Sequence, residues 1–119
     1  MITLESVLNG LENLLLLDGE VFPMDNGYWV KFEVKQTASN ENIPHGIRYS
    51  LTLHDKRNQR VIGYDNAHSF KPTTVGFRTR KVTWDHIHKK DAVMEYGFGS
   101  ADKLMEDFWH SVNSYMDNN

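Results

Sequence analysis

The chain contains no cysteine among its 119 residues. It therefore has no disulfide framework, no thiolate nucleophile and no cysteine-ligated zinc ribbon, and its composition fits a reducing compartment. A run of about 18 apolar residues, which a transmembrane helix requires, is also missing. The first residues, Met1–Glu5, lack the basic region of a secretory signal peptide. We therefore expect a cytoplasmic protein that does not contact a membrane.

An excess of positive charge is absent as well, because 13 Lys and Arg stand against 16 Asp and Glu, a formal net charge of −3. The overall charge therefore gives no indication of nucleic-acid binding. The charges are unevenly distributed, however, since residues 78–90 hold five Lys or Arg and a single acid, Asp85. A local basic segment of this kind can still contact a phosphate backbone.

The length and a hydrophobic fraction of 39% fit a single domain over residues 1–119 with a modest core. Apolar residues at helical spacing predict a helix from about Thr3 to Leu17, and Ser100 is expected to cap a second helix that ends near Met116. Alternating apolar and polar residues predict an antiparallel meander of three strands, at 27–37, 46–54 and 60–64.

Two further short segments, 82–88 and 92–98, are candidates for a fourth and a fifth strand. The order of helix, strands and helix predicts an α+β fold. We expect an antiparallel sheet of about four to five strands, with the N-terminal and the C-terminal helix packed on one face.

Titratable side chains gather between Tyr64 and His88. This segment holds three imidazoles and two carboxylates, from His68, His86, His88, Asp65 and Asp85. Histidine can both give and take a proton near neutral pH, and acids, bases and cations together are what phosphate-ester chemistry uses. We therefore predict a catalytic site of His68, His86, His88 and Asp65 that acts on a phosphate-bearing substrate.

On a strand, His86 and His88 would point to the same face, about 7 Å apart, and Asp85 would point to the other face. Such a pair of imidazoles could divide two proton transfers or bind one metal ion. The structural alternative is a half-exposed strand with solvated histidines. Likewise, Asp65 and Asn66 could merely close a turn through hydrogen bonds from their side chains to the backbone.

The segment between the two groups of histidines lacks clear periodicity and is expected to form a loop. Its basic side chains are candidates for phosphate binding, because binding residues favour loops set on a rigid scaffold. These candidates are Lys71, Arg78, Arg80 and Lys81. The alternative is that they line the solvated side of a strand.

Three features together resemble the TumE-type toxins of bacterial toxin–antitoxin loci. They are the string Arg60-x-x-x-Tyr64-Asp65-Asn66-Ala67-His68, the pair His86-x-His88 and the amphipathic C-terminal helix. The likeness covers about residues 46–116, and the chain departs from the family in having Asp85 where a further histidine is often found. The resemblance implies a small cytoplasmic protein that arrests growth and is neutralised by a cognate DNA-binding antitoxin encoded beside it.

The first functional hypothesis is a metal-independent endoribonuclease that uses no cofactor. RNA supplies its own nucleophile in the 2′-hydroxyl group, so the protein needs a base, an acid and cations around the phosphate. His68 and either His86 or His88 would be the base and the acid, in an order that the sequence leaves open. Asp65 would orient one of the rings.

Two alternatives stand beside it. A metal-dependent nuclease would use His86, His88 and either Asp65 or Asp85 as ligands, because imidazole with carboxylate suits zinc, manganese or iron. A binding module would block its target, RNA or a protein, by occupancy and without chemistry. The expected partners are RNA and the antitoxin, and the chain could also form a homodimer.

Overall fold

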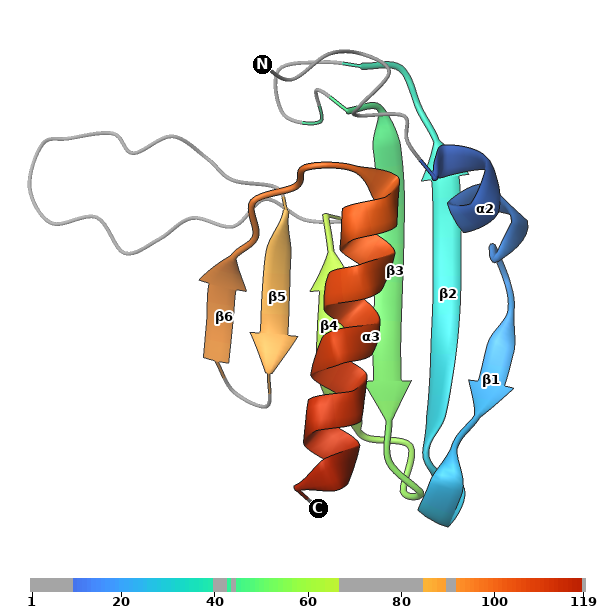
Figure 1. The fold of residues 1–119 in the computed structure, drawn as a ribbon, viewed down its shortest axis with the longest axis vertical. Coiled ribbons are helices and arrows are strands. Elements are labelled where there is room, and N and C mark those ends of the chain that lie inside the picture. Colours follow the sequence, from blue (N-terminus) through green and yellow to red (C-terminus); the bar gives the residue numbers. More distant parts are fainter. Residues whose placement is uncertain (1–9, 40–42, 44, 67–84, 90–91, 119) are drawn as a thin grey trace, which may run out of the picture.

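The computed structural model describes residues 10–39, 43, 45–66, 85–89 and 92–118. Within these residues, six strands form one sheet: β1 (Val21–Pro23), β2 (Trp29–Gln36), β3 (Ile47–His54), β4 (Arg60–Asp65), β5 (His86–Lys89) and β6 (Ala92–Glu95). Their order in the sheet follows the sequence, and each neighbouring pair is antiparallel (Figure 1). The fold is therefore an extended meander.

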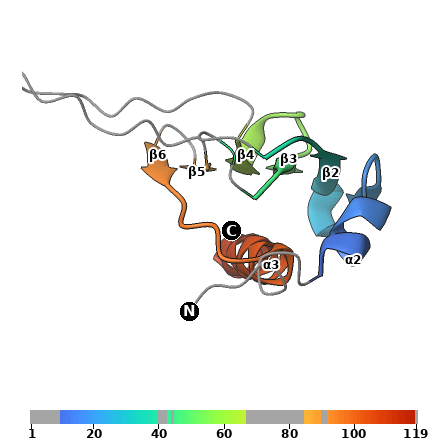
Figure 2. The same ribbon diagram turned by 90° about the horizontal axis from the view of Figure 1, so that it is seen from above.

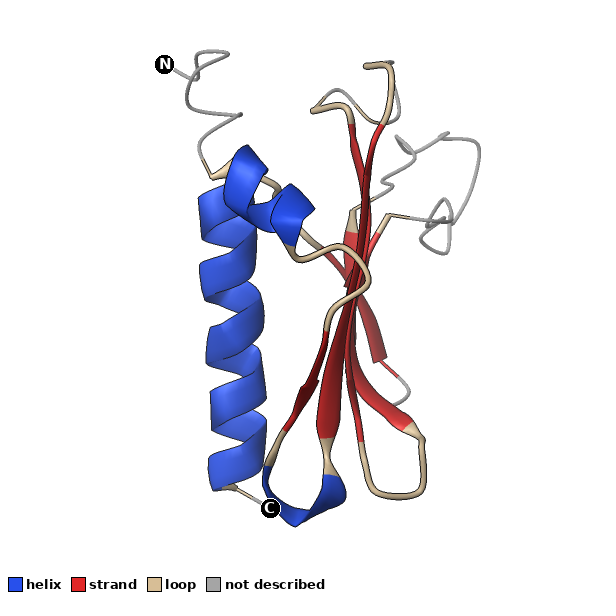
Figure 3. Cartoon of the chain, turned by 90° about the vertical axis from the view of Figure 1, so that its right-hand side faces the viewer, coloured by secondary structure: helices blue, strands red, loops and turns tan. Residues whose placement is uncertain are grey.

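In the described part of the chain, two α-helices accompany the sheet, α2 (Leu11–Leu16) and α3 (Ala101–Asp117), and a 3-10 turn, η1 (Asp25–Gly27), links β1 to β2. Both α-helices lie on the same face of the sheet, as the views from above and along the sheet show (Figures 2 and 3). No described helix covers the opposite face, which we call the open face. Because side chains alternate along a strand, it carries Trp29, Lys31, Arg48, His54, Arg60, Asp65, His86 and His88.

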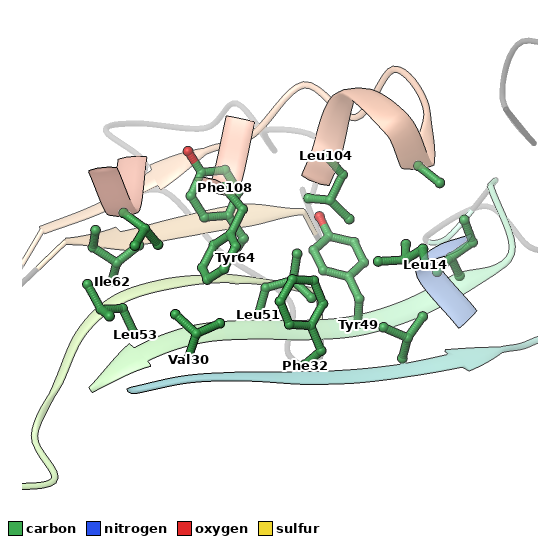
Figure 4. Close-up of a cluster of buried hydrophobic side chains, with 14 of the residues drawn as sticks. Leu14, Val30, Phe32, Tyr49, Leu51, Leu53, Ile62, Tyr64, Leu104 and Phe108 are labelled. Atoms are coloured by element: carbon green, nitrogen blue, oxygen red, sulfur yellow. The ribbon is translucent and has the colours of Figure 1, made fainter. Parts of the chain in front are cut away.

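The core lies between the sheet and α3 (Figure 4). Every second residue of the central strands is buried there, namely Val30, Phe32 and Val34, then Tyr49, Leu51 and Leu53, then Ile62 and Tyr64. Helix α3 meets them with Leu104, Phe108 and Val112, which recur every fourth residue on one helix face. The Phe108 ring packs edge-on against Phe32 and Tyr64, with centroids 5.6 Å and 5.8 Å away. The strands bury every second residue and the helix buries every fourth, so one apolar face of the sheet packs against one apolar face of the helix.

The predicted α+β class and the placement of both helices on one face are confirmed. The predicted meander is present as β2, β3 and β4, and Ser100 caps α3 by accepting a hydrogen bond from the Lys103 N–H at 3.1 Å. The sheet has six strands instead of four or five, because Val21–Pro23 adds an edge strand. A strand of three residues is too short for its apolar and polar residues to show a clear alternation in the sequence. Proline has no N–H to donate to a neighbouring strand, and it is therefore found in edge strands such as this one.

The part of the predicted helix before Gly10 lies outside the described residues. The prediction that one helix runs without a break from Thr3 to Leu17 is wrong at Gly10. This residue has a φ of 81°, in the left-handed region, so the described helix α2 begins only after it. A Cβ atom on Gly10 would collide with the side chain of Asp102 at the start of α3. Close packing of the two helix starts therefore requires a glycine at a position where the apolar periodicity suggested an uninterrupted helix.

Candidate functional site

Neighbouring strands β4 and β5 position the predicted acidic and imidazole side chains (Figure 1). Asp65 is the last residue of β4 and pairs with His86 across the sheet, while His88 pairs with Gly63. Because Tyr64 points into the core, the side chain of Asp65 points to the open face. The same alternation brings His86 and His88 to that face beside it.

The carboxylate of Asp65 lies between the two rings. Nε2 of His86 is 2.7 Å from Oδ1, and Nε2 of His88 is 3.2 Å from Oδ2. The ring centroids are 4.7 Å apart and the ring planes are nearly perpendicular, at 77°. The side chains of Asp65 and His86 are only 8% and 4% exposed, whereas that of His88 is 19% exposed. Solvent therefore reaches this acid–imidazole cluster mainly at His88.

The position of His88 perturbs its protonation. Burial lowers the pKa of His88 from its usual value, and the positive charge of Arg60 acts in the same direction, while the carboxylate of Asp65 opposes both. The ring is accordingly a neutral imidazole at neutral pH. In that form one ring nitrogen carries a lone pair that can take up a proton or bind a metal ion.

Arg60 reaches the cluster along β4. Its Nη1 atom is 3.8 Å from Oδ2 of Asp65, and its side chain is 41% exposed. A Cβ atom on Gly63 would lie only 3.2 Å from Cδ of Arg60. The absence of a side chain at Gly63 therefore leaves space for the side chain of Arg60 to pass over it. Arg60 and Gly63 were not among the predicted site residues. A glycine inside a strand pattern, which marks a close approach, was the available signal.

Asp85 does not join the cluster, although it precedes His86 directly. Its Oδ1 accepts a hydrogen bond from the hydroxyl group of Tyr49 at 2.8 Å and lies 2.9 Å from Nε2 of His45. Nδ1 of His45 accepts the N–H of Ile47 at 3.1 Å, so the proton sits on Nε2 and is donated to Asp85. Asp85 thus ties the start of β5 to β3, which removes it as a ligand beside His86 and His88.

Asn66, the residue after Asp65, is fully buried. Its Nδ2 donates to the carbonyl oxygen of Ile47 at 2.6 Å, and its Oδ1 accepts the N–H of Tyr49 at 2.9 Å. The amide therefore makes hydrogen bonds to the backbone, as the structural alternative for this residue expected, but across to β3 instead of closing a turn. It holds the end of β4, and with it Asp65, against the neighbouring strand.

The structure brings together three of the predicted site residues, Asp65, His86 and His88. The other five lie outside the described residues: His68, Lys71, Arg78, Arg80 and Lys81. Their assignment to proton transfer and phosphate binding stays a prediction.

Taken together, the fold and the cluster define a small α+β protein with titratable groups that can transfer protons or hold a metal ion. The family model of the toxin TumE matches residues 19–116, which include every strand of the described sheet and nearly all of α3. The chain belongs to the TumE toxin family, as its motifs indicated. Comparisons with curated proteins and with solved structures gave no match.

Membership of this family makes the chain the toxin of a toxin–antitoxin pair and implies a cognate antitoxin as its partner. None of the helices in the described part of the chain combines the length and the apolar character needed to span a bilayer.

Proposed function

We propose that this toxin acts in the cytoplasm by cleaving RNA, and that the acid–imidazole cluster of Asp65, His86 and His88 is its reaction centre. One observation carries the proposal: a buried carboxylate contacts two imidazoles, one of which is neutral at neutral pH and open to solvent. A carboxylate that orients an imidazole in this way stabilises the imidazolium ion that forms when the ring takes up a proton.

RNA cleavage needs little more than such a centre and a cation. The 2′-oxygen attacks the neighbouring phosphorus atom, the bond from phosphorus to the 5′-oxygen breaks, and a 2′,3′-cyclic phosphate and a 5′-hydroxyl group result. A base must take the 2′-hydroxyl proton, and an acid must give a proton to the departing 5′-oxygen. No cofactor or protein nucleophile enters this sequence.

Exposure suggests how the roles are divided. His88 is the more accessible ring, and we assign to it the transfer of a proton through the nitrogen that does not face Asp65. His86 is the more buried ring and lies directly against the carboxylate. His68 is the proposed partner for the second proton transfer. Their order as base and acid is left to experiment.

Charge on the reacting phosphate requires compensation as it develops. Arg60 is half-exposed beside the cluster and is suited to this task. Lys71, Arg78, Arg80 and Lys81 are the further proposed phosphate contacts, because they belong to the basic segment between β4 and β5.

Purified toxin at substoichiometric concentration should cleave RNA with turnover. His88→Ala should lower the cleavage rate by at least about tenfold, since one proton-transfer group typically contributes about 10²–10⁴-fold. His110→Ala is a matched control, because this exposed histidine lies on α3, which packs on the other face of the sheet. Equal rates for His88→Ala and the wild type, with both proteins folded, would refute the assignment.

A binding module would give a different result in the same assay. It would retain RNA or a protein target but leave the RNA intact at substoichiometric amounts, because a blocker does not turn over. We also propose that the antitoxin is a DNA-binding protein encoded beside the toxin, which the adjacent reading frame tests. Self-association as a homodimer is tested by light scattering of the purified chain.

A further inference from the structure

One carboxylate oxygen of the acid–imidazole cluster is buried without a hydrogen bond. Oδ1 of Asp65 has no hydrogen-bond partner among the described residues, although Nε2 of His86 is only 2.7 Å away. The two atoms are within hydrogen-bond distance, yet the oxygen accepts no hydrogen bond from the ring. A buried polar atom in this state calls for an explanation, and an ion bound between the two atoms is one.

The spacing of the side chains meets the demands of such an ion. Asp65, His86 and His88 each offer one ligand atom, and these three atoms lie within 4.8 Å of one another. Zinc binds nitrogen and oxygen ligands at about 2.0–2.2 Å, so two ligands of one ion are separated by roughly 3–3.5 Å. Nε2 of His86 is 2.7 Å from Oδ1 and Nε2 of His88 is 3.2 Å from Oδ2, so each ring lies slightly below or within this separation from one oxygen of the carboxylate. Small side-chain adjustments are therefore sufficient to place an ion among the three atoms.

The ligand types also select a class of ion. Two imidazoles with one carboxylate suit zinc, manganese and iron, and three protein ligands leave coordination positions open for water or substrate. Arg60 leaves the carboxylate available, because its Nη1 atom is 3.8 Å from Oδ2 and its side chain reaches solvent.

We infer that Asp65, His86 and His88 form a binding site for one divalent transition-metal ion, for which Zn²⁺ is the probe. Asp85 takes no part in this site, since Tyr49 and His45 engage its carboxylate elsewhere. The inference uses the reaction centre of the proposed function, but ion binding is measured without RNA. The two proposals can therefore fail separately.

The test is a titration of chelator-treated full-length toxin with Zn²⁺, followed by calorimetry or by competition with a chromophoric chelator. We expect one ion per chain at micromolar concentration or below. His88→Ala and Asp65→Asn should each weaken binding at least tenfold, and circular dichroism verifies that both variants are folded. His110→Ala should bind like the wild type, which controls for adventitious binding to imidazole. Absence of binding by the wild type, or equal binding by His88→Ala, would overturn the inference.

RNA cleavage with and without the ion separates this inference from the proposed function. Binding together with cleavage that persists in chelator supports both proposals, and added Zn²⁺ should then inhibit, because ligated rings cannot take up a proton. If the toxin binds the ion and cleaves RNA only when the ion is present, the inference is supported. In that case a water molecule bound to the ion, instead of His88, acts as the base. Cleavage by a toxin that binds no ion overturns the inference alone.

Discussion

The substitution Asn66→Ala should destabilise the fold by about 2–6 kcal/mol. The side chain amide of Asn66 is fully buried and pairs with two backbone groups of β3, the carbonyl oxygen of Ile47 and the N–H of Tyr49. Alanine can replace neither partner, so two buried backbone groups would lose their hydrogen bonds. Each such loss costs about 1–3 kcal/mol. The sum is a large share of the about 5–15 kcal/mol by which most domains are stable.

Urea unfolding followed by tryptophan fluorescence measures this effect. With a slope of about 2 kcal/mol per molar urea, a loss of 2 kcal/mol or more lowers the unfolding midpoint by about 1 M or more. Asn113→Ala is the control, because Asn113 is exposed on α3 and its replacement should change stability by no more than about 0.5 kcal/mol. A loss below about 1 kcal/mol for Asn66→Ala would refute the reasoning that these two hydrogen bonds hold β4 to β3.

Asn66→Asp provides a second check on the same pair of contacts. The carboxylate can still accept the N–H of Tyr49, but its second oxygen would face the carbonyl oxygen of Ile47, which also only accepts. Protonation restores a donor, so the folded state should hold this proton more tightly than the unfolded chain. The destabilisation should therefore grow as the pH rises above about 4 and diminish in acid. A pH-independent loss would contradict the donor role of Nδ2.

Three further outcomes test the packing, the helix cap and the protonation of the open face. Ser100→Ala should cost about 1 kcal/mol in urea unfolding, because the hydroxyl group that accepts the Lys103 N–H is lost. Phe108→Ala should cost about 3–5 kcal/mol in the same assay, since the ring is fully buried and its cavity cannot collapse between a sheet and a helix. Burial lowers the pKa of His54 below 6.5, so the stability that depends on its neutral form is present above pH 6.5 and is lost as the pH falls through the folded-state value. His54→Phe, which keeps a ring stacked on Trp29, should therefore lose less thermal stability than the wild type between about pH 7 and about pH 5.

Local patterns in the sequence determined much of the fold. Alternation of apolar residues specified β2, β3 and β4, and Ser100 marked the start of α3, because strand faces and helix caps depend on neighbouring residues. The same alternation placed His86 and His88 on one face. The motifs around these residues also carried the family assignment, which the match over residues 19–116 confirms.

Contacts between segments that are distant in the sequence could not be predicted from such local patterns. The break at Gly10 depends on Asp102 of another helix, and Asn66 pairs with backbone groups of β3. Asp85 likewise stays out of the acid–imidazole cluster because its carboxylate binds Tyr49, a residue of β3 that is far away in the sequence. None of these partners is indicated by the residues next to the position that it affects.

The register of β5 against β4 is the decisive case. Strand pairing sets Ile87 opposite Tyr64 on the core side and His86 opposite Asp65 on the open face. A slip of one residue would turn both imidazoles toward the helix and separate them from the carboxylate. The sequence by itself determined that an acid and two imidazoles are present and that the two rings share a face. Only the tertiary structure decided that they meet, because the burial of Ile87 and Tyr64 against the core fixes which residues of the two strands stand opposite each other.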